Sequence, residues 1–228
     1  NRTYRGVENV KVFTGSTIIE ILACKRPKMP YNDWRQLMAQ LTQNEIVKRC
    51  QAGESLSGEN LANLDLTNQP LAGIDLSEAN LSGTDLQNAD LTDANLNDAN
   101  LTGANLSGAT LQRTYLVGSD LTDASFEEAN LRGAFLSGSL LCGTNFRRAD
   151  LRRATVGCPR CEMPGPFGSL TSFENANLGE AIFGEIKLKG IILLGANFKD
   201  AYLYEVDLSE AVYREADLEG AITKKGRN

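Results

Sequence analysis

A large apolar residue returns at every fifth position over about a hundred residues, and this spacing constrains the fold more than any other feature. The series begins at Leu56 and Leu61 and runs without a gap to Val156, and a second series runs from Phe173 to Leu218. A period of five fits neither the α-helix, with 3.6 residues per turn, nor the β-strand, with its alternation of two. Fixed self-similarity of this kind predicts a solenoid whose stacked coils share one core.

The repeating unit is defined around the large apolar residue, here called the centre. A small residue, mostly alanine, lies two positions before the centre, and Asp or Asn often lies directly before it. The two residues after the centre are polar or glycine. We predict that the centre and the small residue face inward and that the other three face water. Core positions predicted in this way include Leu76, Leu96, Leu116, Phe126, Phe146 and Phe198.

The unit A-(D/N)-L-x-x, which residues 79–109 repeat almost without deviation, resembles that of the pentapeptide-repeat family. The resemblance implies an all-β solenoid, a right-handed quadrilateral β-helix with one pentapeptide on each side. It covers roughly 54–156 and 171–220, which implies about eight coils and, at an inter-strand spacing of ~4.8 Å, a rod on the order of 37 Å long. The resemblance is specific for fold and says little about function.

Composition favours a folded, non-catalytic protein. Hydrophobic residues make up 42% of the 228 residues and the net charge is −6, so disorder is not expected. No apolar run approaches 18 residues, so no membrane-spanning helix is predicted. Histidine is absent, which removes the usual general base and the commonest metal ligand. We therefore predict no catalytic, cofactor-binding or metal-binding residues, and no cofactor.

Charge is unevenly distributed along the chain. Residues 1–52 hold nine Lys and Arg against four Asp and Glu, whereas residues 53–112 hold nine acidic residues and no Lys or Arg. A phosphate-binding surface needs clustered cations, so direct nucleic-acid binding by the rod is not expected. Residues one coil apart should stack, which brings like charges together and predicts an acidic surface that attracts a basic partner. Its residues are Asp65, Asp85, Glu78 and Asp98.

Some pentapeptide-repeat proteins protect DNA gyrase by mimicking duplex DNA, and this chain resembles them in repeat and acidity. The resemblance therefore implies an alternative function, an acidic DNA mimic acting on a DNA-binding enzyme such as gyrase.

The N-terminal 53 residues precede the repeats and are predicted to form a cap. Residues 7–13 and 17–22 have strand-like patterns. A helix is predicted from Asn32 or Asp33, and a second from the capping box of residues 42–45, ending at Gly53. Two such helices would cover the open end of the first coil. The junction at residues 45–66 also resembles that of BTB-domain proteins with pentapeptide tails, which implies a second alternative, an adaptor fragment.

Residues 157–170 interrupt the repeats with a segment rich in proline and glycine. Either a functional loop or a neutral insertion fits this composition. Cys158 and Cys161 within it have a CxxC spacing, which is typical of a redox pair or half of a zinc site. Three interpretations stay open: a loop-closing disulfide or redox pair, two unpaired thiols, and, least favoured, a metal or catalytic role.

A cluster of arginines lies at residues 147–153, the only basic cluster in the repeats. Because one coil is about twenty residues, Arg147 should stack beside Glu127 and Arg148 beside Glu128. This predicts two cross-coil ion pairs in preference to an anion site, and exposed pairs of this kind contribute less than ~1 kcal/mol each.

The sequence thus predicts five segments: a cap (1–53), two runs of repeats (54–156 and 171–222), the loop (157–170) and a basic tail (223–228). The predicted function is a protein–protein interaction scaffold or structural subunit that docks through its faces, its loop or its C-terminal end. Apolar residues near that end also predict a homodimer. Because the chain begins at Asn1, we expect a fragment or a processed product. The family's distribution implies the cytoplasm or the chloroplast and thylakoid of a photosynthetic organism.

Overall fold

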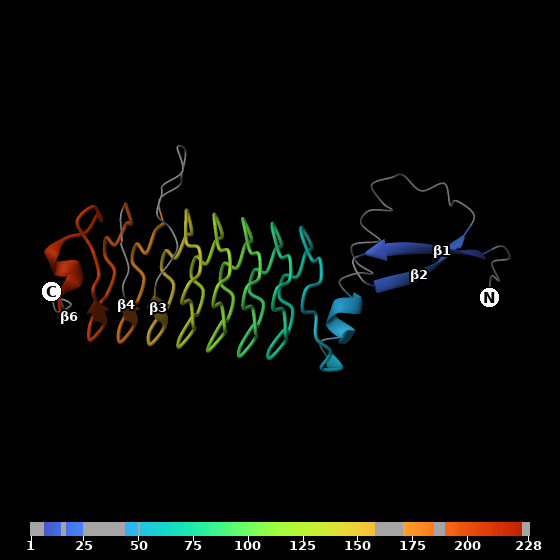
Figure 1. Cartoon of the computed structure of the whole chain (residues 1–228), viewed down its shortest axis with the longest axis horizontal. Helices are drawn as coiled ribbons and strands as arrows, with labels where there is room; N and C mark the ends of the chain where they lie inside the picture. The colour runs from blue at the N-terminus through green and yellow to red at the C-terminus, as the bar shows by residue number, and fades with distance from the viewer. Residues whose placement is uncertain are drawn as a thin grey trace.

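The computed structural model describes residues 7–14, 17–24, 44–49, 51–157, 171–184 and 190–224. Strands β1 (Val7–Thr14) and β2 (Thr17–Cys24) form an antiparallel hairpin in which Thr14 pairs with Thr17. These strands fall on the two segments whose sequence is strand-like. From residue 51 onward the described chain is a rod of stacked coils (Figure 1).

Each coil contains twenty residues and has four pairing positions. Asn60 bridges to Asn80, Asp65 to Asp85, Pro70 to Asp90 and Asp75 to Asn95, all in parallel, and the same register continues up the rod. Backbone bonds hold neighbouring coils together: the amide of Leu96 donates to the carbonyl of Tyr115 over 2.7 Å. Four five-residue sides per coil make a β-helix solenoid, as the repeat predicted.

The corners of the coil explain the period of five. In most repeats the residue two positions after the centre has a positive φ, as in Asn63 (59°), Glu78 (59°) and Gly73 (70°). One left-handed residue after each short extended segment turns the chain onto the next side. Glycine, Asn and Asp tolerate this conformation best, which is why they are common at this position.

The core follows the predicted pattern from Leu56 to Leu203. The six centre residues named from the sequence are each at most 1% exposed: Leu76, Leu96, Leu116, Phe126, Phe146 and Phe198. Where a hydroxyl residue replaces the small alanine, it is buried and donates to a carbonyl of the coil below. The Oγ1 of Thr84, for example, lies 2.8 Å from the carbonyl of Leu61. The buried hydroxyls therefore have hydrogen-bond partners, as buried polar groups in folded proteins usually do.

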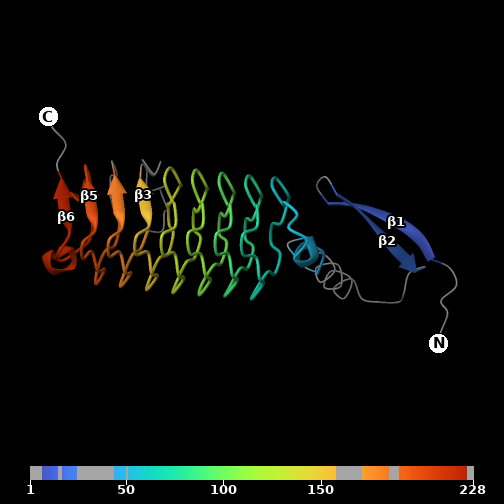
Figure 2. The ribbon, with the colours of Figure 1, turned by 90° about the horizontal axis from the view of Figure 1, so that it is seen from below.

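The register changes once, between the two runs of repeats. Asn145 bridges to Ser172 and Asp150 to Asn177, an offset of 27, after which the offset returns to 20. The coil at this point is thus seven residues longer than the others. Four parallel strands stack along one side of the rod, in the order β3 (Thr155–Gly157), β4 (Ile182–Gly184), β5 (Tyr202–Tyr204) and β6 (Ile222–Lys224) (Figure 2).

Helical segments lie near both ends of the described rod. Residues 44–49 and 51 are helical, and Ile46 of this helix is 4% exposed and belongs to the core cluster. The helix predicted from Asn32 or Asp33 lies outside the described residues. At the other end the chain forms a 3-10 helix, η1 (Glu215–Leu218).

Near the C-terminus the repeat pattern mispredicts the core. Two predicted centres are not fully buried: Tyr213 is 37% exposed and Leu218 is only partly buried. Asp217, the residue directly before Leu218 in η1, is instead 5% exposed. Here the described chain forms η1 in place of a regular repeat, which the pentapeptide pattern does not anticipate. Among the described residues, no helix is long and apolar enough to cross a membrane.

Candidate functional site

The predicted acidic surface lies on the first coils and is built partly from turn-forming carboxylates. Asp65 and Asp85 pair directly, one coil apart. The carboxylate of Asp65 accepts hydrogen bonds from the hydroxyl of Thr67 (2.7 Å) and from its amide (3.0 Å), and these bonds lower the pKa of Asp65. Asp85 accepts the amide of Gln87 over 3.1 Å. Stacked aspartates are therefore stabilised by N–H donors of their own turns, which offsets their mutual repulsion.

The other two acidic residues lie at a different place around the coil, at the corner between the side of Asp75 and the side of Asn80. Glu78 and Asp98 have φ of 59° and 57° and are exposed. None of the four acidic residues forms an ion pair within the described part of the chain. Their charges thus face solvent without a compensating cation, as an acidic surface for a basic partner requires.

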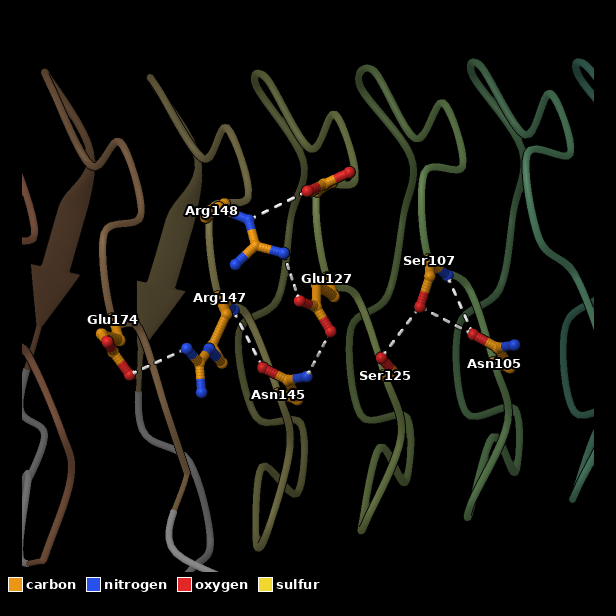
Figure 3. A network of polar contacts seen from close by, with 9 residues as sticks. Asn105, Ser107, Ser125, Glu127, Asn145, Arg147, Arg148 and Glu174 are labelled. Atoms are coloured by element: carbon orange, nitrogen blue, oxygen red, sulfur yellow. Dashed lines mark hydrogen bonds and ion pairs between the residues drawn. The ribbon is translucent and has the colours of Figure 1, made fainter.

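The arginine cluster forms a continuous polar network that contains one of the two predicted ion pairs, Arg148 with Glu128 (Figure 3). Arg148 lies 2.9 Å from Glu128 and also 2.5 Å from Glu127. Arg147 lies 3.5 Å from Glu174 of the following coil, where an ion pair with Glu127 had been predicted. Glu127 accepts hydrogen bonds from Arg148 and from the side-chain amide of Asn145 (3.4 Å). Arg147 therefore points towards the carboxylate of Glu174 in the next coil.

The remaining arginines of the cluster are also paired. Arg152 contacts Asp150 at 2.5 Å and Arg153 contacts Glu180 at 2.9 Å. Burial raises the pKa of Asp150, but the hydrogen bonds from Arg152 and the charges of Arg152 and Arg132 outweigh it and hold that pKa below its ordinary value. The cluster is therefore charge-compensated, which favours a structural role over an anion site.

At the C-terminal end, the carboxylate of Asp217 takes the place of the backbone carbonyl that accepts the equivalent amide in other coils, as the carbonyl of Leu194 accepts the amide of Asn175. The Asp217 carboxylate accepts the amide of Gly195 (3.1 Å) from the coil below, and the amide of Arg214 (2.8 Å) within η1's N-terminal turn. The guanidinium of Arg214 donates to it over 2.7 Å. The hydrogen bonds from Arg214 lower the pKa of Asp217 to about 2.

Replacement of Asp217 by asparagine is expected to lower the melting temperature at pH 7 by weakening these contacts. Because the folded-state pKa lies near 2 and the ordinary value is 3.8, the carboxylate's contribution is full above pH 4 and is lost as pH falls through 2. The melting difference between wild type and variant should therefore shrink between pH 4 and pH 2. Calorimetry across that range measures it; a constant difference would mean that the charge of Asp217 is not involved.

One outward column of the rod is apolar in its C-terminal half, which inspection of single repeats did not predict. Asp75 and Asn95 begin the column, and Tyr115, Phe135, Thr155, Ile182, Tyr202 and Ile222 continue it in successive coils. The five apolar members of the column are 39–52% exposed. Together with Thr155 they are here called the apolar face. The rings of Tyr115 and Phe135 stack with centroids 5.0 Å apart. The sequence contains this column, but it becomes visible only when residues twenty positions apart are compared.

The cysteines give a partial picture. Cys158 and Cys161 lie outside the described residues, so their pairing stays a prediction. Cys142, which the sequence did not single out, is disulfide-bonded. Among the described residues, no group of three or more His, Cys, Asp or Glu is placed to hold a metal ion.

Comparison with known proteins identifies the repeat. The family model described as pentapeptide repeats matches in eight copies, at residues 60–98, 99–138, 119–156 and 171–209, which is more than half of the chain. No curated protein gives a significant match.

Several solved structures resemble the chain. HetL of the cyanobacterium Nostoc, a pentapeptide repeat protein involved in heterocyst differentiation regulation, is 28% identical over 79% of this chain and 96% of its own, with a TM-score of 0.31. QnrB1, a plasmid-mediated fluoroquinolone resistance protein, is 15% identical over 75% of this chain and 83% of its own, with a TM-score of 0.43. A protein of the Arabidopsis thaliana thylakoid lumen is 26% identical over 65% and 68%, with a TM-score of 0.22.

Proposed function

The chain belongs to the pentapeptide-repeat family, whose members are generally structural or interaction proteins, and from that premise we propose that it is a non-catalytic docking scaffold. The proposal rests mainly on one observation: the exposed side chains change from acidic to apolar along the rod, while the backbone of the coils stays the same. The first coils carry exposed carboxylates such as Glu78 and Asp98, and the later coils carry the apolar face. A rigid rod with two chemically distinct stretches is suited to hold partners at fixed positions.

The acidic stretch is proposed to dock a basic protein. Residues 53–112 contain no Lys or Arg. Arg49 and Arg113, on either side of the stretch, pair with Glu54, Glu59 and Asp93, which leaves the other six acidic residues without an ion pair among the described residues. A surface of one sign raises the association rate of an oppositely charged partner and selects against acidic ones. The turn-forming aspartates are held in fixed positions by their own hydrogen bonds, which lowers the entropy lost on binding.

The proposal is tested by the double variant Asp85→Asn/Asp98→Asn. Asparagine is native at both position types, directly before the centre in Asn80 and at a corner in Asn88, so the fold should persist. Affinity purification from the native source, read by mass spectrometry, should recover a basic partner with the wild type. The purified partner should then bind the double variant roughly three- to tenfold more weakly, since exposed charge pairs contribute ~0.2–1 kcal/mol each. Wild-type affinity should also fall as salt rises.

A matched control removes two charges from later coils. Asp120→Asn/Asp123→Asn changes the same two position types outside the acidic stretch. This control should weaken binding less than the double variant does, because Asp120 and Asp123 follow the acidic stretch and lie farther from its centre. Equal weakening by both variants would show that net charge matters and the proposed acidic surface does not.

A DNA-mimic function is the second candidate, and the stacked, unpaired carboxylates favour it. Asp65 and Asp85 are one coil apart, as are Glu78 and Asp98, so two columns of the first coils carry negative charges at a regular spacing, as a duplex carries its phosphates. A gyrase supercoiling assay in the presence of a fluoroquinolone separates the two functions. Protection of the enzyme by the purified chain would support mimicry, and its absence together with capture of another basic protein would support the scaffold. An adaptor role in a longer BTB-type protein would require a BTB domain upstream in the same gene.

We further propose that the helix at residues 44–51 caps the first of about eight coils. Ile46 is 4% exposed and packs within the core cluster. Arg49 of the same helix lies 3.2 Å from Glu59 and donates to the carbonyl of Ser55 over 2.9 Å. These contacts tie the helix to the first coil, whose unpaired backbone edge would otherwise be open to other chains.

A further inference from the structure

We propose that the apolar face is a dimer interface, in which strands β3–β6 of one protomer pack face to face against those of a second copy. Five side chains are 39–52% exposed in one column, and Tyr204 of the neighbouring row is 40% exposed. Since an aromatic side chain can bury 150–250 Å², the column and its neighbours leave on the order of 500 Å² of apolar surface per protomer. A patch of this size is near the upper end of the largest apolar patch on a typical monomer, and such patches are often functional. With its polar margins the face approaches the roughly 600–800 Å² per partner that specific dimers bury.

Two glycines give this face a hollow that internal packing does not require. Gly157 and Gly184 pair with each other in β3 and β4, and neither has a positive φ. A Cβ on Gly184 would meet nothing within 4 Å, and one on Gly157 would make only ordinary contacts at 3.6 Å. Glycine inside a strand often marks a close approach by another chain or a ligand. Tyr204, in the same row on β5, supplies a projection of matching size.

The charges at the two ends of β5 select one orientation of the dimer. Asp200 lies at the corner before the strand and Glu205 at the corner after it. A two-fold axis along the rod would place the corner before each strand opposite the corner after it, bringing Asp200 against Glu205 of the second copy. Juxtaposed like charges disfavour that arrangement.

A two-fold axis parallel to strand β4 avoids the contact of Asp200 with Glu205 and makes the two rods antiparallel. It sets Glu180, at the corner before β4, opposite its own copy, and there Arg153 lies 2.9 Å from Glu180 and offsets its charge. Centred on Ile182, the axis places the coil of β3 opposite the coil of β5 in the second copy, because these strands flank β4. Arg153, at the corner before β3, then faces Asp200 of the other chain, and Tyr204 faces the hollow at Gly157. The same axis sets Phe135 opposite Ile222, so that apolar residues meet across the interface.

This inference goes beyond the scaffold function and does not depend on its partner. The acidic stretch lies on the first coils, whereas the interface starts at the coil of Phe135. Purified full-length chain is sufficient for the test, so failure of the dimer would leave the docking experiment unaffected.

The apolar face is tested by Tyr202→Asp in sedimentation equilibrium and in gel filtration with light scattering. Wild type should have twice the 24.7 kDa mass of one chain, and the variant should be monomeric or dissociate at least roughly tenfold more readily. Asp is native at the same position in Asp150, so the rod should fold, which circular dichroism checks. Thr110→Asp is the matched control on a polar side and should stay dimeric. A monomeric wild type overturns the proposal, as does a Tyr202→Asp dimer, which would assign association to another surface such as the C-terminal end.

The antiparallel register is tested by charge exchange at the margin. Arg153→Asp and Asp200→Arg should each weaken dimerisation several-fold, and the double variant should recover most of the wild-type affinity. Both corners adopt a φ near 60°, where Arg and Asp occur natively, as in Arg113 and Asp93. Arg153→Asp also removes the ion pair with Glu180, so recovery in the double variant is the decisive measurement. Failure to recover, with Tyr202→Asp still monomeric, would overturn the antiparallel arrangement.

Discussion

Replacement of Leu96 by arginine is expected to lower the free energy of unfolding by at least about 4 kcal/mol. Leu96 is fully buried near the middle of the first run. It is stacked between Leu76 and Leu116, because the residues before these centres pair in the order Asp75, Asn95 and Tyr115. A guanidinium at this position would lose its hydration among leucine side chains. The thin core offers no route to solvent that keeps the coils in contact, so the middle of the rod should separate locally.

Urea denaturation followed by circular dichroism measures this effect, with Asp98→Arg as the control. The control adds the same side chain two residues later, at an exposed corner with φ of 57°. Arg113 and Arg148 occupy equivalent corners at φ of 55° and 56°, so the backbone accepts arginine there. The control should change stability by less than about 1 kcal/mol, as surface substitutions usually do. Near-normal denaturation of Leu96→Arg would show that the centre positions do not line the interior.

The core could be predicted from sequence because the repeat encodes it locally. Each five-residue unit contains its own inward centre, its small neighbour and its left-handed corner, so the position of Leu96 required no knowledge of distant contacts. The same reasoning failed at Ala216-Asp217-Leu218, which reads as an ordinary repeat. There Asp217 is buried and Leu218 only partly so, because Asp217 accepts hydrogen bonds from the amides of Gly195 and Arg214. The contact with Gly195 joins two coils, and a local pattern does not include it.

The surface could be predicted less well because it depends on neighbours in adjacent coils. Arg147 had Glu127 below it and Glu174 above it, and the second lies 27 residues later because of the longer coil. The sequence showed that the loop changes the register but not which residues would meet across it. The apolar face was missed for a related reason: Tyr202 and Ile182 occupy a position that most repeats fill with Asp or Asn, and only alignment by coil brings them together.

Replacement of Phe146 by alanine is expected to cost about 3–5 kcal/mol and to loosen the second run of repeats from the first. Phe146 is fully buried, and its ring stacks on Phe126 at 5.1 Å and on Phe173 at 4.8 Å between centroids. The contact with Phe173 lies where the register changes, so this stack joins the two runs across the longer coil. Removing the central ring leaves a cavity between two aromatic side chains whose backbones are held by the coils.

Hydrogen exchange distinguishes this loss of coupling from uniform destabilisation. In Phe146→Ala, amides of residues 171–184 and 190–224 should lose protection before those of residues 76–116, because repeat stability is a sum of nearest-neighbour terms. Tyr115→Ala is the control: its ring also stacks, on Phe135 at 5.0 Å, but it is 45% exposed. That variant should lose only about 1 kcal/mol, as expected for one aromatic pair. Equal losses from both variants, or uniform loss of protection along the rod, would contradict a role of the buried stack in joining the two runs.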